Sequence, residues 1–184
     1  MTRLRFSTAL EVFDAFPTLR DDVQAAPTGD APTVFLLALG RSGTPEDGVA
    51  FGAYVLGRRE TVWWACQCVR LLIPGLEATE PALRAAEAWV YAPEEENRLA
   101  ALRLGADADR RVPTTWLALA AGWSGGNIAP PGLGAVQAPP HYTARAARVA
   151  VLSGLAHVPA RDRSDRLNRC LEGALRLMQP QDAP

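Results

Sequence analysis

The residues of this sequence whose types could support catalysis are few, and they are widely spaced. Ser124 and His141 could act as a nucleophile and its base across one loop, but no third group is placed to orient the histidine. The sequence contains no G-x-S-x-G motif, no P-loop and no H-E-x-x-H motif. We therefore predict no catalytic residues, and a hydrolytic enzyme is only the third of our functional hypotheses.

The cysteines and histidines lack the spacing of a metal site. Cys66 and Cys68 lie two residues apart in a helical pattern, so their side chains point about 200° away from each other. His141 and His157 add no ligand spacing. A free cysteine usually behaves as a small hydrophobic residue, so we expect Cys66, Cys68 and Cys170 to be buried structural thiols. We predict neither a metal ion nor a cofactor.

Three adjacent glutamates could suggest a metal or acid–base site. Glu94, Glu95 and Glu96 follow Pro93, which is the pattern of a first helical turn. Carboxylates there stabilise the positive end of the helix dipole, and this is the role that we predict for them. Glu94 and Arg98 also have the i, i+4 spacing of a favourable ion pair.

Composition limits the class of protein. The 184 residues carry a formal net charge of −1, and 48% of them are hydrophobic. A nucleic-acid-binding protein normally has a basic face, so we expect no nucleic acid partner. No apolar run approaches the length of a membrane span, and the first residues lack the apolar stretch of a signal peptide. We expect no membrane insertion and a cytoplasmic location.

The hydrophobic pattern predicts helices throughout. Apolar residues recur at spacings of three and four in segments that end at proline or glycine, and no period-two pattern persists. We predict an all-α fold of seven to nine helices in a compact bundle or a short stack of antiparallel helix pairs. The whole chain, 1–184, is expected to form a single helical domain. Its predicted parts are peripheral N-terminal helices (1–43), a core (44–157) that includes a long loop (124–142), a C-terminal helix (158–178) and a frayed tail (179–184).

The segment Arg59–Ile73 is the most strongly patterned helix, and we expect it to be central. Its narrow polar stripe contains Trp63 between Arg59 and Gln67. Two interpretations of this tryptophan are open. A neighbouring helix could cover it while Arg59 or Arg70 stacks on its ring, or it could be an aromatic residue that binds a partner.

No charged side chain occurs between Arg111 and Arg145. The first part of this gap, Val112–Trp123, predicts a helix that is apolar on every side and belongs in the core. The second part, Ser124–Tyr142, contains four glycines and four prolines and predicts a long loop. We expect Thr143 to cap the helix that follows this loop.

The loop has two interpretations. In the structural one it crosses the surface and packs Ile128, Leu133 and Val136 into grooves between helices. In the functional one its proline-rich segments, APPG and APPHY, form a rigid surface that another protein recognises. The candidate binding residues are those of the loop, its flanking helix ends and one nearby polar stripe. They are Arg58, Arg59, Trp63, Trp123, Ser124, Asn127, Pro130, Pro131, His141 and Tyr142.

Four sequence segments together resemble an uncharacterised family of small helical bacterial proteins. They are RRETVWWACQCVR (58–70), LRAAEAWV (83–90), PEEENRLAA (93–101) and WSGGNIAPPG (123–132). The resemblance extends over residues 44–157. Members of that family have no assigned activity and tend to be encoded beside type VI secretion components and effector-loading proteins.

The resemblance implies a non-enzymatic accessory or adaptor protein in type VI secretion. Its partner would be another protein, namely a secretion component, an effector or a toxin. The resemblance carries over no functional residues. A weaker likeness, over about forty residues of alanine-rich helix, is to immunity proteins that neutralise a toxin by occlusion, and this is the alternative hypothesis.

Overall fold

The computed structural model describes residues 4–77, 79–130 and 132–179, and over these residues the protein is all-α, as predicted. They form nine α-helices and two short 3-10 helices, with no β-strand. The α-helices are α1 (Ala9–Ala15), α2 (Pro32–Gly40), α3 (Asp47–Val55), α4 (Arg58–Leu72), α5 (Pro81–Tyr91), α6 (Glu95–Asp107), α7 (Pro113–Gly122), α8 (Tyr142–Ala156) and α9 (Arg163–Met178). The 3-10 helices are η1 (Pro17–Asp21) and η2 (Ala160–Asp162). Residues 180–184 of the tail that we predicted to fray lie outside the described residues.

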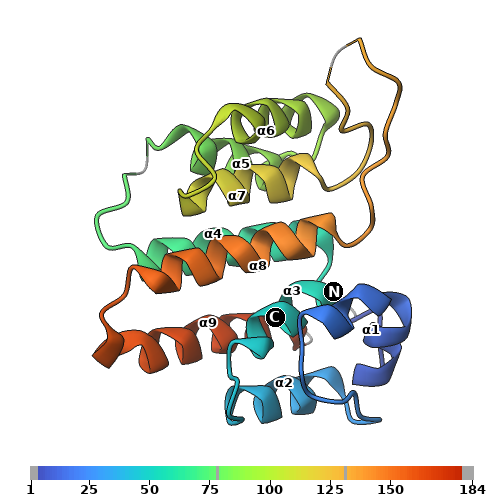
Figure 1. The fold of residues 1–184 in the computed structure, drawn as a ribbon, viewed down its shortest axis with the longest axis vertical. Helices are drawn as coiled ribbons and strands as arrows, with labels where there is room; N and C mark the ends of the chain where they lie inside the picture. The colour runs from blue at the N-terminus through green and yellow to red at the C-terminus, as the bar shows by residue number, and fades with distance from the viewer. Residues whose placement is uncertain (1–3, 78, 131, 180–184) are drawn as a thin grey trace, which may run out of the picture.

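The helices are arranged in three layers, which Figure 1 shows from top to bottom. The upper layer holds α5, α6 and α7, the middle layer holds α4 and α8 side by side, and the lower layer holds α1, α2, α3 and α9. The middle layer is covered on both sides, because α4 and α8 contact helices of the upper and the lower layer. This position explains why the sequence pattern of α4 is apolar over most of its circumference.

The predicted all-round apolar helix is α7, and it is buried as expected. Leu117, Ala118, Leu119 and Ala120 are all at most 1% exposed. Small alanine side chains allow close approach between helices, and α7 contacts α4, α5, α6 and α8. Helix α7 therefore belongs to the core, and it fixes the starting point of the long loop.

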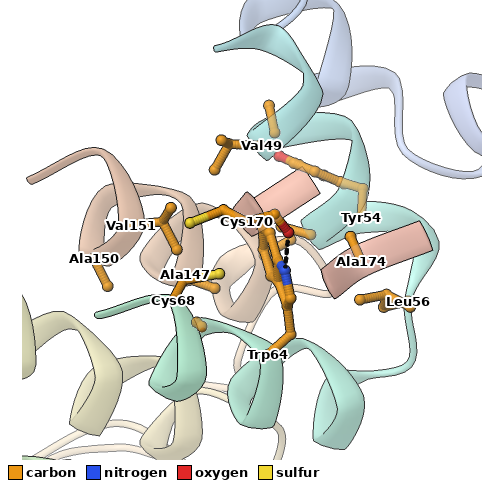
Figure 2. Close-up of a cluster of buried hydrophobic side chains, with 14 of the residues drawn as sticks. Val49, Tyr54, Leu56, Trp64, Cys68, Ala147, Ala150, Val151, Cys170 and Ala174 are labelled. Carbon is orange, nitrogen blue, oxygen red and sulfur yellow. Dashed lines mark hydrogen bonds between the residues drawn. The ribbon is translucent and has the colours of Figure 1, made fainter. Parts of the chain in front are cut away.

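A buried cluster between α3, α4, α8 and α9 joins the middle layer to the lower one (Figure 2). Its largest member is Trp64, whose indole Nε1 donates a hydrogen bond to the backbone oxygen of Cys170 at 2.9 Å. The prediction of buried thiols is confirmed, because Cys66, Cys68 and Cys170 are all free and buried. Burial raises the pKa of the Cys66 and Cys68 thiols, so both stay protonated and unreactive at neutral pH.

The start of α8 differs from the prediction. Thr143 does not cap the helix, since the N-cap residue of α8 is His141, two residues earlier, and the helix begins at Tyr142. The threonine instead lies inside the first turn, 2% exposed, and its hydroxyl has no hydrogen-bond partner among the described residues. Helix α8 starts directly after Pro139, Pro140 and His141, so its first turn already includes Thr143. A threonine can act as an N-cap only when it precedes the first turn.

Two further properties of the described residues bear on function. None of the described helices combines the length and the apolar character that crossing a bilayer requires. Over the same residues, no group of three or more His, Cys, Asp or Glu side chains gathers in a way that could hold a metal ion.

Candidate protein-interaction site

The structure divides the predicted site residues into two groups. The first lies at or beside the loop between α7 and α8, and it consists of Arg58, Trp123, Ser124, Asn127, Pro130, His141 and Tyr142. The second, Arg59 and Trp63, lines a different concavity on the outer side of α4. Pro131 lies outside the described residues. In Figure 1 the loop leaves α7, projects beyond the helices at the upper right and returns to α8.

A buried arginine, Arg98, for which we predicted an ion pair with Glu94, holds the loop in place. Arg98 is 4% exposed, and its guanidinium donates to the backbone oxygens of Gly122 at 2.7 Å and Asn127 at 3.1 Å. The same guanidinium makes a bidentate pair with Glu95 at 2.6 and 2.7 Å. The predicted Glu94–Arg98 pair is therefore wrong, because Arg98 turns inward across α6 toward the loop.

A sequence signal for the inward direction of Arg98 does exist. Arg98, Ala101 and Gly105 share one face of α6 at spacings of three and four, and they are the buried residues of that helix. Small residues at this spacing indicate a face packed closely on a neighbour, and Arg98 continues that face. The carboxylate that accompanies it is Glu95, whose pKa is lowered by the hydrogen bonds from Arg98.

We call Gly122–Asn127 the loop base, and its glycines are required by close contacts. Gly126 has a φ of 62°, and a Cβ there would lie 2.9 Å from the Arg98 Nη2 atom. A Cβ on Gly122 would lie 2.6 Å from the Cα of Leu102 in α6. The chain turns at Gly126 and passes close to α6 at Gly122, and both features need glycine.

Hydrogen bonds made by the backbone and by the Asn127 side chain order the loop beyond its base. The Asn127 side-chain oxygen accepts hydrogen bonds from the backbone N–H groups of Ala129 at 3.1 Å and Val136 at 2.8 Å. The two sides of the loop are also paired directly, by Ile128 N–H to Val136 O at 2.8 Å and Ala138 N–H to Gly126 O at 3.1 Å. The loop thus folds back on itself as a short hairpin, and Asn127 fixes its register.

Aromatic rings and a second arginine complete the base. Trp123 lies between Trp116 and Tyr142, with ring centroids 6.4 and 5.1 Å away. Arg58 donates a hydrogen bond from Nη1 to the backbone oxygen of Ser124 at 2.7 Å. Tyr142 contacts His141 in turn. Both ends of the loop are therefore tied to each other and to α4.

The hypothetical Ser124–His141 pair is not joined in this arrangement. No hydrogen bond connects the two side chains in the portion of the chain that the structure describes. Burial lowers the pKa of His141, and the neighbouring Arg145 charge lowers it further. Ser124 is 9% exposed, and its described contacts are made through its backbone.

We call Gly132–Val136 the loop tip, and its apolar side chains face solvent. Leu133 is 67% exposed and Val136 is 52% exposed, whereas Ile128 is partly covered. The structural interpretation, in which Leu133 and Val136 pack into grooves between helices, is therefore wrong for these two residues. The hairpin hydrogen bonds satisfy the backbone without burying the side chains of the tip.

The second group of predicted residues lines a concavity of about 810 Å³ between α4, α5 and the end of α9. Trp63 is 45% exposed there. The expected stacking partners are engaged elsewhere, since Arg59 donates to the backbone oxygen of Val90 at 2.6 Å and Arg70 pairs with Glu87 at 2.9 Å. The interpretation in which a helix and an arginine cover Trp63 is therefore wrong.

The sequence of this chain matches a known protein family. A family model matches residues 35–178, which span α3 to α9, most of α2 and the long loop. The chain belongs to DUF6931. That family is described as one of unknown function, in agreement with the predicted membership of an uncharacterised family. Searches of the curated proteins and of the solved structures gave no match.

Proposed function

We propose that this DUF6931 protein is a non-enzymatic binding protein that recognises another protein through its loop tip. The observation that carries the proposal is the contrast in exposure within one loop. Leu133 and Val136 are exposed at the tip, while Ser124 in the base is buried, as is Arg98 of α6, which holds the base. A binding segment that is already ordered loses less conformational entropy when it binds, so more of the contact energy appears as affinity.

The chemistry of the tip favours a partner with an apolar surface patch. No charged residue occurs between Arg111 and Arg145, so the hairpin presents only apolar and uncharged polar groups. The cores of protein interfaces are depleted in charge and gain stability from buried apolar area. The partner that fits is a protein with a shallow hydrophobic depression, and the tip would insert Leu133 and Val136 into it.

The cellular setting of this proposal comes from the sequence resemblance. We propose an accessory or adaptor role in type VI secretion, in the cytoplasm, with a secretion component or an effector as the partner. A toxin bound in a tight stoichiometric complex would instead favour the immunity hypothesis. Turnover of a substrate that is lost in both Ser124→Ala and His141→Ala would favour the enzyme.

The experiment is affinity capture from the native host with two forms of the full chain. One form is wild type, and in the other a glycine–serine linker of equal length replaces residues 128–140. We expect a specific protein to be recovered by the wild type and lost by the linker form. Equal recovery by both forms, or no specific protein with either, would contradict the proposal. Matching thermal unfolding curves are the control for folding.

A further inference from the structure

A small cavity lies where the loop returns to α8. Its volume is about 90 Å³, and it is enclosed by the N-terminal segment, the end of α3, the start of α4 and the first turn of α8. Pockets for drug-sized ligands start at about 300 Å³, so this one has room only for waters or one small ion. The lining residues with polar side chains are Arg5, Arg58, Tyr54, Thr61 and Thr143.

Thr143 is the clearest sign that the cavity takes a ligand. It lines the cavity, is 2% exposed, and its Oγ1 atom has no hydrogen-bond partner in the described part of the chain. Thr61, which also lines the cavity, is satisfied by the backbone oxygen of Ala53 at 2.9 Å. A buried hydroxyl without a partner is unusual in proteins, because it gives up its hydrogen bonds to water.

The backbone around Thr143 offers two more hydrogen-bond donors. Thr143 and Ala144 are the second and third residues of α8, and neither N–H has an acceptor among the hydrogen bonds of the described residues. His141 at the N-cap makes no side-chain capping bond. The first turn of a helix binds anions readily, because free N–H groups and the helix dipole act together.

Two arginines add positive charge to the same cavity. Arg58 bonds to the backbone oxygen of Ser124, and Arg5 makes one long bond of 3.4 Å to the backbone oxygen of Leu56. Within residues 4–77, 79–130 and 132–179, neither arginine forms an ion pair with a carboxylate. Guanidinium groups suit the oxygens of phosphate and sulfate, and two of them favour a doubly charged ion.

We propose that this cavity binds a phosphate-sized oxyanion, held by Thr143, by the first turn of α8 and by Arg5 and Arg58. The free ion fits the volume, whereas a nucleotide does not. Arg58 also holds Ser124 at the start of the loop, and Thr143 follows its end. Binding of the ion would therefore tighten the connection between the two ends of the loop. The proposal is independent of the protein partner of the tip.

Isothermal titration of the full chain with inorganic phosphate tests the proposal, with chloride used to keep the ionic strength constant. We expect saturable binding with a dissociation constant of about 1 mM or lower, and weaker binding of acetate, which carries one charge. Sulfate should compete with phosphate. No saturable binding, or acetate binding as tight as that of phosphate, would overturn the assignment.

Three variants locate the site. Arg5→Gln and Arg58→Gln should each weaken phosphate binding about tenfold, and Thr143→Val should weaken it severalfold. Arg84→Gln, an exposed arginine of α5, is the matched control and should bind as the wild type does. Thr143→Val loses no hydrogen bond within the protein, so its unfolding temperature in chloride should stay at or above the wild-type value. Unchanged phosphate affinity in Thr143→Val would contradict the site even if an arginine variant failed to fold.

Discussion

The base and the tip of the same loop differ in how closely they contact the helices of the protein. At the base, Arg98 is buried and satisfies the carbonyl groups of Gly122 and Asn127, and two glycines fit against α6. At the tip, Leu133 and Val136 are exposed. The comparison shows that the WSGGN part of the loop serves the fold. The residues available to a partner are those of the tip, such as Leu133 and Val136, which the base holds away from the helices.

The largest effect on stability should come from the base. Arg98→Ala removes the donor to the buried backbone oxygen of Gly122 and to the partly buried one of Asn127, and we expect a loss of about 3 kcal/mol of unfolding free energy. The control is Arg103→Ala, an exposed arginine of the same helix, which should change stability by less than about 0.5 kcal/mol. Urea denaturation measures both. Equal effects of the two changes would mean that Arg98 does not anchor the loop.

A smaller loss of unfolding free energy is expected for Gly126→Ala, and Gly125→Ala is its control. Gly126→Ala forces an alanine into a left-handed conformation and brings a methyl group against Arg98, so we expect a loss of about 2 kcal/mol. A Cβ on Gly125 would approach nothing closer than Arg58 Nη1 at 3.9 Å. Gly125→Ala should therefore be close to neutral in the same denaturation experiment. Comparable losses in both variants would contradict the described turn.

The change in unfolding free energy with pH that Glu95 causes should be smaller than either of these losses, because the Glu95 side chain is 64% exposed. The pKa of Glu95 is lowered from 4.5 in the folded protein, so its pairing with Arg98 stabilises the fold above that pH. This contribution is lost as the pH falls through the lowered pKa of the folded state. Glu95→Gln should be less stable than the wild type by less than about 1 kcal/mol at neutral pH. The difference should shrink as the pH falls below 4.5 and through the lowered pKa, and a difference that stayed constant over this fall would exclude the ion pair as its cause.

The tip should show the smallest effect on stability. Leu133→Ser combined with Val136→Ser removes little buried surface, so we expect unfolding free energy to change by less than about 0.5 kcal/mol. Thermal and urea unfolding measure this. A large loss would mean that the tip packs against the body of the protein and that the contrast between base and tip is wrong.

The sequence was informative where local pattern decides the structure. The periodicity predicted the all-α class and the central position of α4, and the composition of Val112–Trp123 predicted the core helix α7. It also located the loop, because glycine, proline and missing charges are local features. The burial of the three thiols was predicted from the usual behaviour of a free cysteine as a small hydrophobic residue.

The misses concern contacts between elements that are distant in sequence. Arg98 reaches the loop because α6 packs against α7, and this approach decides between Glu94 and Glu95 as its carboxylate. The exposure of Leu133 depends on a hairpin whose hydrogen bonds join residues about ten positions apart and require the turn at Gly126. The cavity at Thr143 needs the N-terminal segment, α3, α4 and α8 together, so no single stretch of sequence reveals it.

The most direct test of the account is the affinity of the captured protein, once purified, for three forms of this chain. They are the wild type, the tip variant Leu133→Ser/Val136→Ser, and Val34→Ser. Val34 is a matched control, since it is 52% exposed like Val136 but lies on α2. We predict that the tip variant binds at least about tenfold more weakly, a loss of about 1.4 kcal/mol, and that Val34→Ser binds as the wild type does. Equal affinity of the tip variant and the wild type would contradict the central claim that the loop tip is the binding surface.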